Sequence, residues 1–167
     1  EMAIRPILLE KFKQQTWKNQ VERYFLTRKS SLDQVVYSLI RTKNPGLAHE
    51  LYFRIVEEEQ TFAEVAREYS EGPEGRTGGL LGPVPLIQPH PSISKILSVS
   101  QPGQIWAPRP LTEWTVIIRL EKFIPAQLDD SMRRRLMDEL LENWIREQIG
   151  KIGLLKPLGS DVSDVKV

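Results

Sequence analysis

Residues 62–82 read FAEVAREYSEGPEGRTGGLLG and place a short amphipathic helix pattern directly before a cluster of glycines. Thr61 and Glu64 have the spacing of a capping box, which predicts a helix from about residue 62 through Tyr69. Five of the ten glycines of the chain lie between Gly72 and Gly82. The chain is therefore predicted to turn tightly after this helix.

The segments on both sides of this stretch predict strands and helices in an irregular order. Residues 34–42 (QVVYSLIRT) and 114–124 (WTVIIRLEKFI) are β-branched and apolar, which is typical of buried strands. Short strands are also expected in the proline-rich segment that precedes residue 110. Helix patterns cover four further segments, residues 7–26, 47–58, 92–98 and 130–150. Because strands and helices do not alternate regularly, the order favours an α+β fold with an antiparallel sheet.

The composition excludes several classes of site and partner. The 167 residues include no cysteine, and the two histidines, His49 and His90, are too few for a histidine-rich metal centre. A net charge of +1 argues against nucleic acid as the main partner. No apolar stretch reaches the length of a membrane span. We therefore expect neither a metal nor a cofactor, and no membrane span.

Four motifs follow one another in the order and register of a known domain family. They are the helix Phe62–Ala66 with Tyr69–Ser70, the turn Gly78–Gly82, the segment Pro102–Ile105 and the strand Trp114–Ile118. In this, residues 33–124 resemble a parvulin-type (rotamase) peptidyl-prolyl isomerase domain. The resemblance implies a small antiparallel sheet surrounded by helices, with a shallow groove that binds proline.

The resemblance also implies where catalytic groups would lie, and those positions hold other residues. Parvulins keep two histidines on neighbouring strands, which fall here on Ser38 and Val116. Their Cys or Asp near the amide falls on Gly72, and a small polar residue falls on Glu113. No catalytic residue is therefore assigned with this resemblance.

The apolar positions that hold the proline ring are better preserved. The family's Leu position is Leu81, whereas its Met and Phe positions are Pro89 and Ile93. His90 follows Pro89 directly, and Trp114 stands where the family has a glycine. These five residues are the substrate-binding candidates.

The expected function follows from this contrast. We expect a parvulin-like domain that binds proline-containing or apolar protein segments, with weak or no isomerase activity. Two alternatives stay open. The first is an active isomerase that uses Glu113 and His90 in a rearranged site. The second is a structural or docking subunit whose groove is filled by Trp114.

The flanking helices predict a second part of the molecule. We expect an N-terminal helix at residues 1–30 and a parvulin-like domain at residues 31–125. A C-terminal helix at residues 126–153 is expected to pack on the N-terminal helix, and a tail follows at residues 154–167. This arrangement is similar to bacterial foldases with an inserted parvulin domain, and implies protein or peptide clients and self-association through the terminal helices. Because Glu1 already lies in a helix pattern, we expect further helices before it. The compartment stays open between cytoplasmic and secretion-associated.

Overall fold

The structure, a computed structural model, describes residues 4–153, which belong to two compact units. One unit comprises residues 28–126. The other comprises the described residues on either side, 4–27 and 127–153. The tail expected at residues 154–167 lies outside the described residues.

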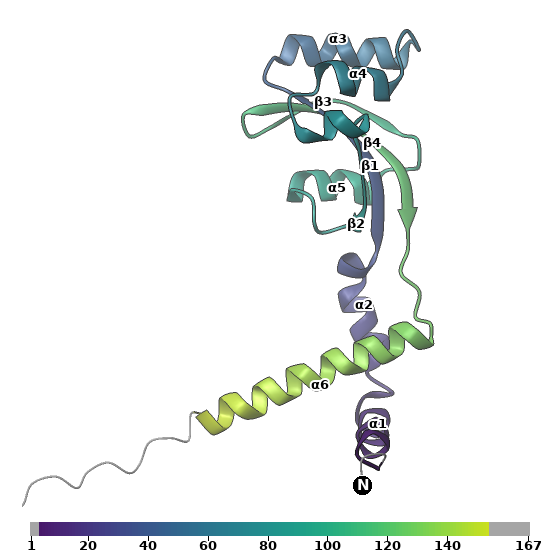
Figure 1. Ribbon diagram of the computed structural model, residues 1–167, viewed down its shortest axis with the longest axis vertical. Coiled ribbons are helices and arrows are strands. Elements are labelled where there is room, and N and C mark those ends of the chain that lie inside the picture. Colours follow the sequence, from purple (N-terminus) through teal and green to yellow (C-terminus); the bar gives the residue numbers. More distant parts are fainter. Residues whose placement is uncertain (1–3, 154–167) are drawn as a thin grey trace, which may run out of the picture. The chain divides into compact units, whose positions relative to one another are not determined.

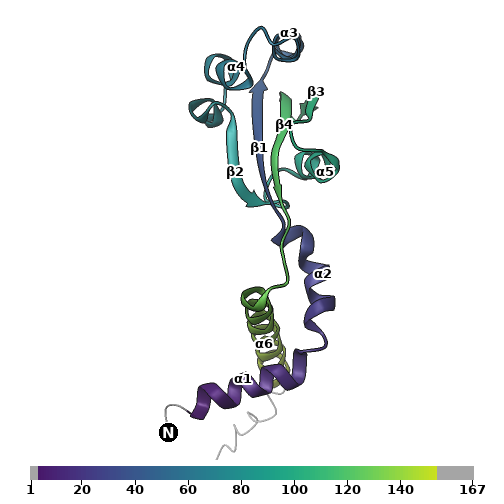
Figure 2. The same ribbon diagram turned by 90° about the vertical axis from the view of Figure 1, so that its right-hand side faces the viewer.

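The unit of residues 28–126 is built on a four-stranded antiparallel sheet (Figure 1). Its strands are β1 (Gln34–Thr42), β2 (Leu80–Pro85), β3 (Ile105–Leu111) and β4 (Trp114–Ile124). Their spatial order is β2-β1-β4-β3, so the two longest strands lie in the centre (Figure 2). The fold is α+β with an antiparallel sheet, as the sequence predicts.

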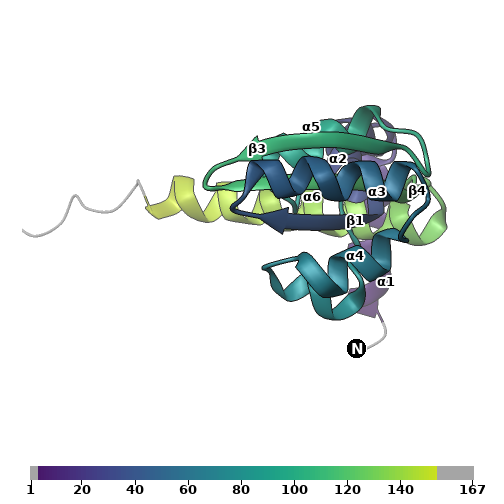
Figure 3. The ribbon, with the colours of Figure 1, turned by 90° about the horizontal axis from the view of Figure 1, so that it is seen from above.

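Helices cover both faces of this sheet. The helical elements are α3 (Pro45–Val56), α4 (Phe62–Tyr69), the 3-10 helix η1 (Pro73–Thr77) and α5 (Pro91–Val99). Leu51 of α3 and Phe62 of α4 pack on one face, in a core with Ile40 and Ile117, and the two helices lie next to each other (Figure 3). On the other face α5 buries Ile93 and Leu97 against β1 and β4. This second face carries the cavity described below.

Local sequence signals explain where the helices begin. The hydroxyl of Thr61 accepts a hydrogen bond from the Glu64 amide, and the Glu64 carboxylate accepts one from the Thr61 amide, which confirms the capping box. Asn44 caps α3 in the same way by accepting from the Leu47 amide. This helix therefore begins at Pro45, two residues before the predicted start, because proline is well tolerated in the first helical turn.

The two ends of the sheet unit lie side by side. Gln34 at the start of β1 pairs with Ile124 at the end of β4. Just before the strand, the Asp33 carboxylate accepts a hydrogen bond from the Ala126 amide at 2.8 Å. The Asp33 carbonyl also accepts from the Leu86 amide. These bonds tie the beginning and the end of the unit to each other.

The second unit is helical. It contains α1 (Ile4–Trp17), the first part of α2 (Val21–Leu32) and α6 (Asp130–Gly153). A single helix over residues 7–26 was the expectation, and it is wrong, because a turn at residues 18–20 divides α1 from α2. Within this unit α1 contacts α6 through an ion pair of Lys13 with Asp138 and a ring contact of Phe12 with Trp144. Over residues 4–153 no helix is both long and apolar enough to cross a bilayer.

Candidate functional site

The candidate site is a cavity of about 340 Å³ between α5 and the sheet, here called the central cavity. Its walls come from β1, β2, the start of α5 and the hairpin that joins β3 to β4. The apolar lining residues are Leu39, Leu81, Ile93, Leu111, Trp114 and Val116. The polar ones are Tyr37, Arg41, His90 and Thr112.

Five of the residues singled out in the sequence meet at this cavity: Leu81, His90, Ile93, Trp114 and Val116. They come from β2, the start of α5 and β4. Pro89, the remaining substrate-binding candidate, does not line the cavity, although its carbonyl accepts a hydrogen bond from the Ser94 hydroxyl inside α5. The cavity is therefore formed by most, but not all, of the predicted apolar positions.

Ser38 lies on the opposite face of β1. Its side chain is 3% exposed, and its hydroxyl donates a hydrogen bond to Glu121 at 2.6 Å. Neighbouring residues of a strand point to opposite faces, so the cavity receives Tyr37 and Leu39 instead. The β1–β4 register shifts between Val36 and Tyr37, so Glu121 has no register partner on β1. Its carboxylate accepts hydrogen bonds from Ser38 and from Arg119.

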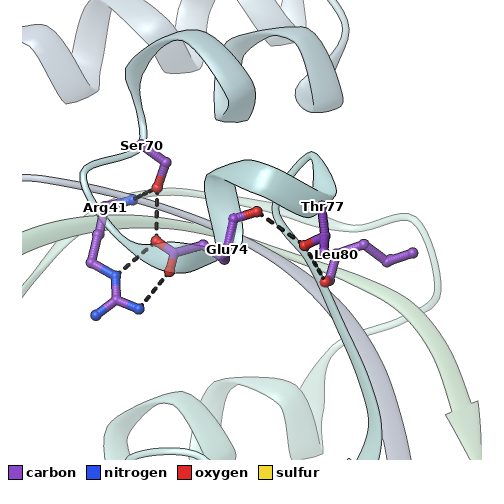
Figure 4. Close-up of polar contacts among 5 residues, drawn as sticks. All are labelled: Arg41, Ser70, Glu74, Thr77 and Leu80. Carbon is purple, nitrogen blue, oxygen red and sulfur yellow. Dashed lines mark hydrogen bonds and ion pairs between the residues drawn. The ribbon is translucent and has the colours of Figure 1, made fainter.

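Gly72 lies beside a partly buried ion pair that fills the space a side chain would need. Figure 4 shows this pair, Arg41 with Glu74. Arg41 donates two hydrogen bonds to the Glu74 carboxylate, from Nε at 2.7 Å and from Nη2 at 2.5 Å. The Ser70 hydroxyl donates a third at 2.7 Å. A Cβ atom on Gly72 would come within 2.4 Å of both carboxylate oxygens and of Arg41 Nε. A Cys or Asp at this position, the residue types that the family uses, would therefore require the side chains of Arg41 and Glu74 to shift.

The charges of this network are mutually stabilised. Burial of Glu74 would raise the pKa of its carboxyl, but the hydrogen bonds from Arg41 and Ser70 outweigh burial and hold that pKa below its ordinary value. The hydrogen bonds that Arg41 donates to Glu74 raise the pKa of Arg41. Burial raises the pKa of the Tyr37 phenol, so this group is a neutral hydroxyl at neutral pH. Arg41 and Glu74 thus form a stable ion pair at one end of the cavity.

Thr77 closes the 3-10 helix that carries Glu74. Its hydroxyl lies 3.0 Å from the carbonyl oxygen of Glu74 and 2.8 Å from that of Leu80 (Figure 4). Gly78 and Gly79 follow with positive φ angles of 66° and 83°, a conformation that favours glycine. The glycine cluster therefore turns the chain from η1 into β2 and brings Leu81 to the cavity.

The two titratable candidates occupy different places. His90 lines the cavity, and its Nδ1 accepts a hydrogen bond from the Ser92 amide at 3.2 Å, so the ring caps α5. Glu113 lies outside the cavity lining, with its side chain 66% exposed and 3.9 Å from the Lys43 ammonium. The structure therefore does not bring His90 and Glu113 together at the cavity.

Trp114 forms one wall of the cavity without closing it. The Arg41 guanidinium lies 5.8 Å from the centre of its ring and the Lys43 ammonium 5.0 Å, so cations surround the indole. Thr112, in the preceding turn, has a φ angle of 55°, which is rare for a β-branched residue. This backbone conformation reverses the chain sharply between β3 and Trp114.

Tyr37, Arg41 and Leu39 are the functional candidates that sequence reasoning missed. The signal was present, because residues 37, 39 and 41 alternate along a strand that was predicted with the right bounds. The assignment of Ser38 to the cavity was out of phase with this alternation. Among the described residues no group of His, Asp and Glu side chains could hold a metal ion.

Comparison with known proteins identifies the sheet unit. Residues 40–122 match the family model described as the PPIC-type PPIase domain of the rotamases, which confirms the resemblance seen in the sequence. Among curated proteins no sequence match is found.

Solved structures share the fold at low sequence identity. The peptidylprolyl isomerase PrsA from Bacillus anthracis is 21% identical with a TM-score of 0.55, over 76% of this chain and 58% of that one. The foldase protein PrsA from Streptococcus pneumoniae is 13% identical with a TM-score of 0.54, over 80% and 52%. A structure from work on two SurA-like chaperones of Campylobacter jejuni is 15% identical with a TM-score of 0.53, over 96% and 72%. The chain thus spans little more than half the length of either PrsA protein.

Proposed function

We propose, from the premise that residues 40–122 form a parvulin-type domain, that the central cavity binds proline-containing or apolar segments of other proteins. In this proposal the domain accelerates proline isomerisation weakly or not at all. The clients are other polypeptides, and binding rather than catalysis is the main activity.

The shape and lining of the cavity support binding. Its volume of about 340 Å³ lies at the lower end of the range for small-molecule pockets, which suits a pyrrolidine ring and its neighbours. Its apolar lining comes from different elements, with Leu81 on β2, Ile93 on α5 and Val116 on β4. Apolar walls remove the ring from water, and this favours binding without any covalent chemistry.

The polar groups support weak catalysis at most. Rotation about an X–Pro amide has a barrier of about 18–20 kcal/mol, and an enzyme lowers it only by binding the twisted amide more tightly than the planar one. Two donor atoms of Arg41 are already bonded to Glu74, and Val116 and Gly72 offer no polar side chain. The observation that carries the proposal is the Arg41–Glu74 pair in the space beside Gly72.

The binding half of the proposal is tested with an isotope-labelled full chain and a short proline peptide. We expect amide shifts at residues that line the central cavity. Leu81→Asp should lower the peptide affinity roughly tenfold or more, because it places a charge in an apolar wall. Leu80→Asp is the matched control, because Leu80 is 49% exposed and does not line the cavity. Equal affinities of the two variants would overturn this half.

The catalytic half is tested with a standard prolyl-peptide isomerisation assay. General acid–base groups contribute about 10²–10⁴-fold, so the chain should be slower than an ordinary parvulin by at least about a hundredfold. A rate comparable to that of an ordinary parvulin would contradict the proposal.

The second candidate is an active isomerase, and the observation in its favour is that His90 lines the cavity. If it holds, His90→Ala abolishes catalysis. Because the histidine also caps α5, His90→Asn is the companion variant, since asparagine retains the cap and removes the imidazole. Loss of activity in both variants supports the active enzyme, and unchanged activity in His90→Asn opposes it.

The docking alternative, with Trp114 filling the groove, predicts no peptide binding at all. The cavity between Leu81, Ile93 and Trp114 argues against it. Self-association through the terminal helices remains part of the proposal, since Ile7 and Leu8 of α1 and Ile149 of α6 are more than half exposed. Light scattering of the full chain should then show a mass above that of a monomer, which Leu8→Asp reduces.

A further inference from the structure

A second cavity, here called the side cavity, lies between α5 and β3 and has a volume of about 520 Å³. Ile96 and Val99 of α5 form one wall, and Trp106 of β3 forms the other. Val116 and Ile118 of β4 lie at its floor. Both the family resemblance and the proposed function leave this cavity unused.

The side cavity adjoins the central cavity, because Ile93, Leu111 and Val116 line both. An extended segment whose proline occupies the central cavity would therefore place a nearby side chain over the side cavity. Side chains of an extended chain alternate at about 3.3 Å per residue, so a spacing of about two residues is sufficient.

The wall at Trp106 is held in place by polar contacts. Its indole Nε1 donates a hydrogen bond to the Ser100 hydroxyl at 2.8 Å, and that hydroxyl donates to the Ile96 carbonyl at 2.7 Å. The Arg109 guanidinium lies 4.9 Å from the centre of the indole ring. A positioned indole face next to an aliphatic helix face suits a large apolar or aromatic side chain.

The charges around the side cavity are of one sign. Lys95 on α5 and Arg109 on β3 both line it, and none of the lining residues is acidic. Within residues 4–153 neither cation takes part in an ion pair. A carboxylate on the bound segment would therefore complement both cations.

We infer that the side cavity is a specificity subsite for an apolar or aromatic side chain followed by an acidic one. Both belong to the same client segment whose proline occupies the central cavity. The inference rests on the proposed function, because the proline anchors the segment. It adds a sequence preference that the central cavity alone does not provide.

The test compares two peptides by amide-shift titration of the labelled full chain. The short peptide carries the proline alone, and the extended peptide adds a Phe-Asp pair two residues away, prepared once on each side of the proline. We expect one extended peptide to bind about tenfold tighter than the short one, because it buries a large apolar side chain. Its additional shifts should fall on α5 and β3.

Two substitutions assign the gain to the side cavity. Val99→Asp, at the last residue of α5, should reduce the affinity of the extended peptide to that of the short one. Val56→Asp is the matched control, because Val56 is the last residue of α3, is 47% exposed against 68% for Val99, and lines neither cavity. Arg109→Glu should remove the preference for a Phe-Asp over a Phe-Lys peptide, because the new carboxylate offsets the remaining cation Lys95.

The outcomes separate this inference from the proposed function. If the short peptide shifts the central cavity and neither extension adds affinity, the inference is overturned and the proposed function stands. If the extended peptide shifts only α5 and β3, with sensitivity to Val99→Asp, proline does not bind the central cavity; the proposed function then fails, and the inference fails with it because the segment lacks its anchor. A gain that survives Val99→Asp and Arg109→Glu would also overturn the inference.

Discussion

The two faces of strand β1 are used for different purposes. Ser38, Ile40 and Thr42 form what we call the packed face, where each side chain is at most 3% exposed. Tyr37 and Leu39 belong to the open face, which lines the central cavity. The same nine residues therefore supply both a support for the core and part of the cavity lining.

The difference between the faces shows that support of the fold and lining of the cavity fall to separate side chains. The packed face is fixed by the core under α3 and α4, which does not depend on what the cavity contains. The open face keeps its apolar walls, while its polar end is taken up by the ion pair of Arg41 and Glu74. A change in the polar groups of the open face would therefore leave the core under α3 and α4 in place.

The largest effect should come from damage to the packed face. Phe62 is 1% exposed in the core with Ile40 and Ile117, so Phe62→Ala should lower the free energy of unfolding by about 3–5 kcal/mol. The control Phe53→Ala, at a side chain that is 55% exposed, should change it by less than about 0.5 kcal/mol. Urea unfolding measures both. Similar losses in the free energy of unfolding in the two variants would mean that the core on the packed face does not stabilise the fold more than the exposed surface does.

The next effect concerns the ion pair at the end of the open face. Glu74→Gln should cost about 3 kcal/mol at neutral pH, because it leaves Arg41 partly buried without its counter-charge. The hydrogen bonds from Arg41 and Ser70 lower the pKa of Glu74, so the stabilisation is fully present above the ordinary glutamate pKa of about 4.3. It is lost as the pH falls through the lower pKa of the folded state.

Urea unfolding of wild type and Glu74→Gln at several pH values checks this dependence. The difference in free energy of unfolding should be constant around neutrality and should shrink in acid. Glu57→Gln, at an exposed glutamate after α3, is the control and should show little difference at any pH. A difference that grows as the pH falls would contradict the assignment.

A smaller effect is expected from filling the space beside the ion pair. Gly72→Ala places a Cβ against Arg41 and Glu74 and should cost about 1–2 kcal/mol through overpacking. Gly150→Ala in α6 meets open space and should be neutral or slightly stabilising, since alanine favours helices. Thermal unfolding distinguishes the two. An unchanged melting temperature for Gly72→Ala would show that the ion pair moves aside readily.

The smallest effect should follow from Glu113→Ala. The pair of Glu113 with Lys43 is exposed, so its loss should change stability by less than about 1 kcal/mol. The affinity for a proline peptide should also stay the same, because Glu113 does not line the central cavity. A tenfold loss of affinity in a peptide titration would show that Glu113 takes part in peptide binding.

Much of the fold could be predicted from local sequence signals. The bounds of β1 and β4 were predicted correctly, because β-branched runs are bounded by turns and proline. The turn at residues 18–20 was missed, because it contains neither glycine nor proline and the apolar spacing continues across it from Trp17 to Val21. A helix pattern alone does not show such a break.

The site was predicted less completely, for reasons of geometry. Leu81, Ile93 and Trp114 were found because apolar positions keep their order along the chain. The pairing of Arg41 with Glu74 joins residues 33 positions apart, and no local pattern marks it. A resemblance by spacing does not show which face of the sheet a strand residue occupies. The family's histidine position was therefore placed on Ser38, whereas Tyr37 lines the cavity.

The pairing of Gln34 with Ile124, closed by the bond from Ala126 to Asp33, has a consequence for how such chains are assembled. A folded segment whose two ends meet can be inserted into a host polypeptide or removed from it, because the two points of connection in the host lie close together. Residues 34–124 therefore have the topology of an exchangeable cassette. A host chain could retain, replace or duplicate such a cassette independently of the rest of its architecture.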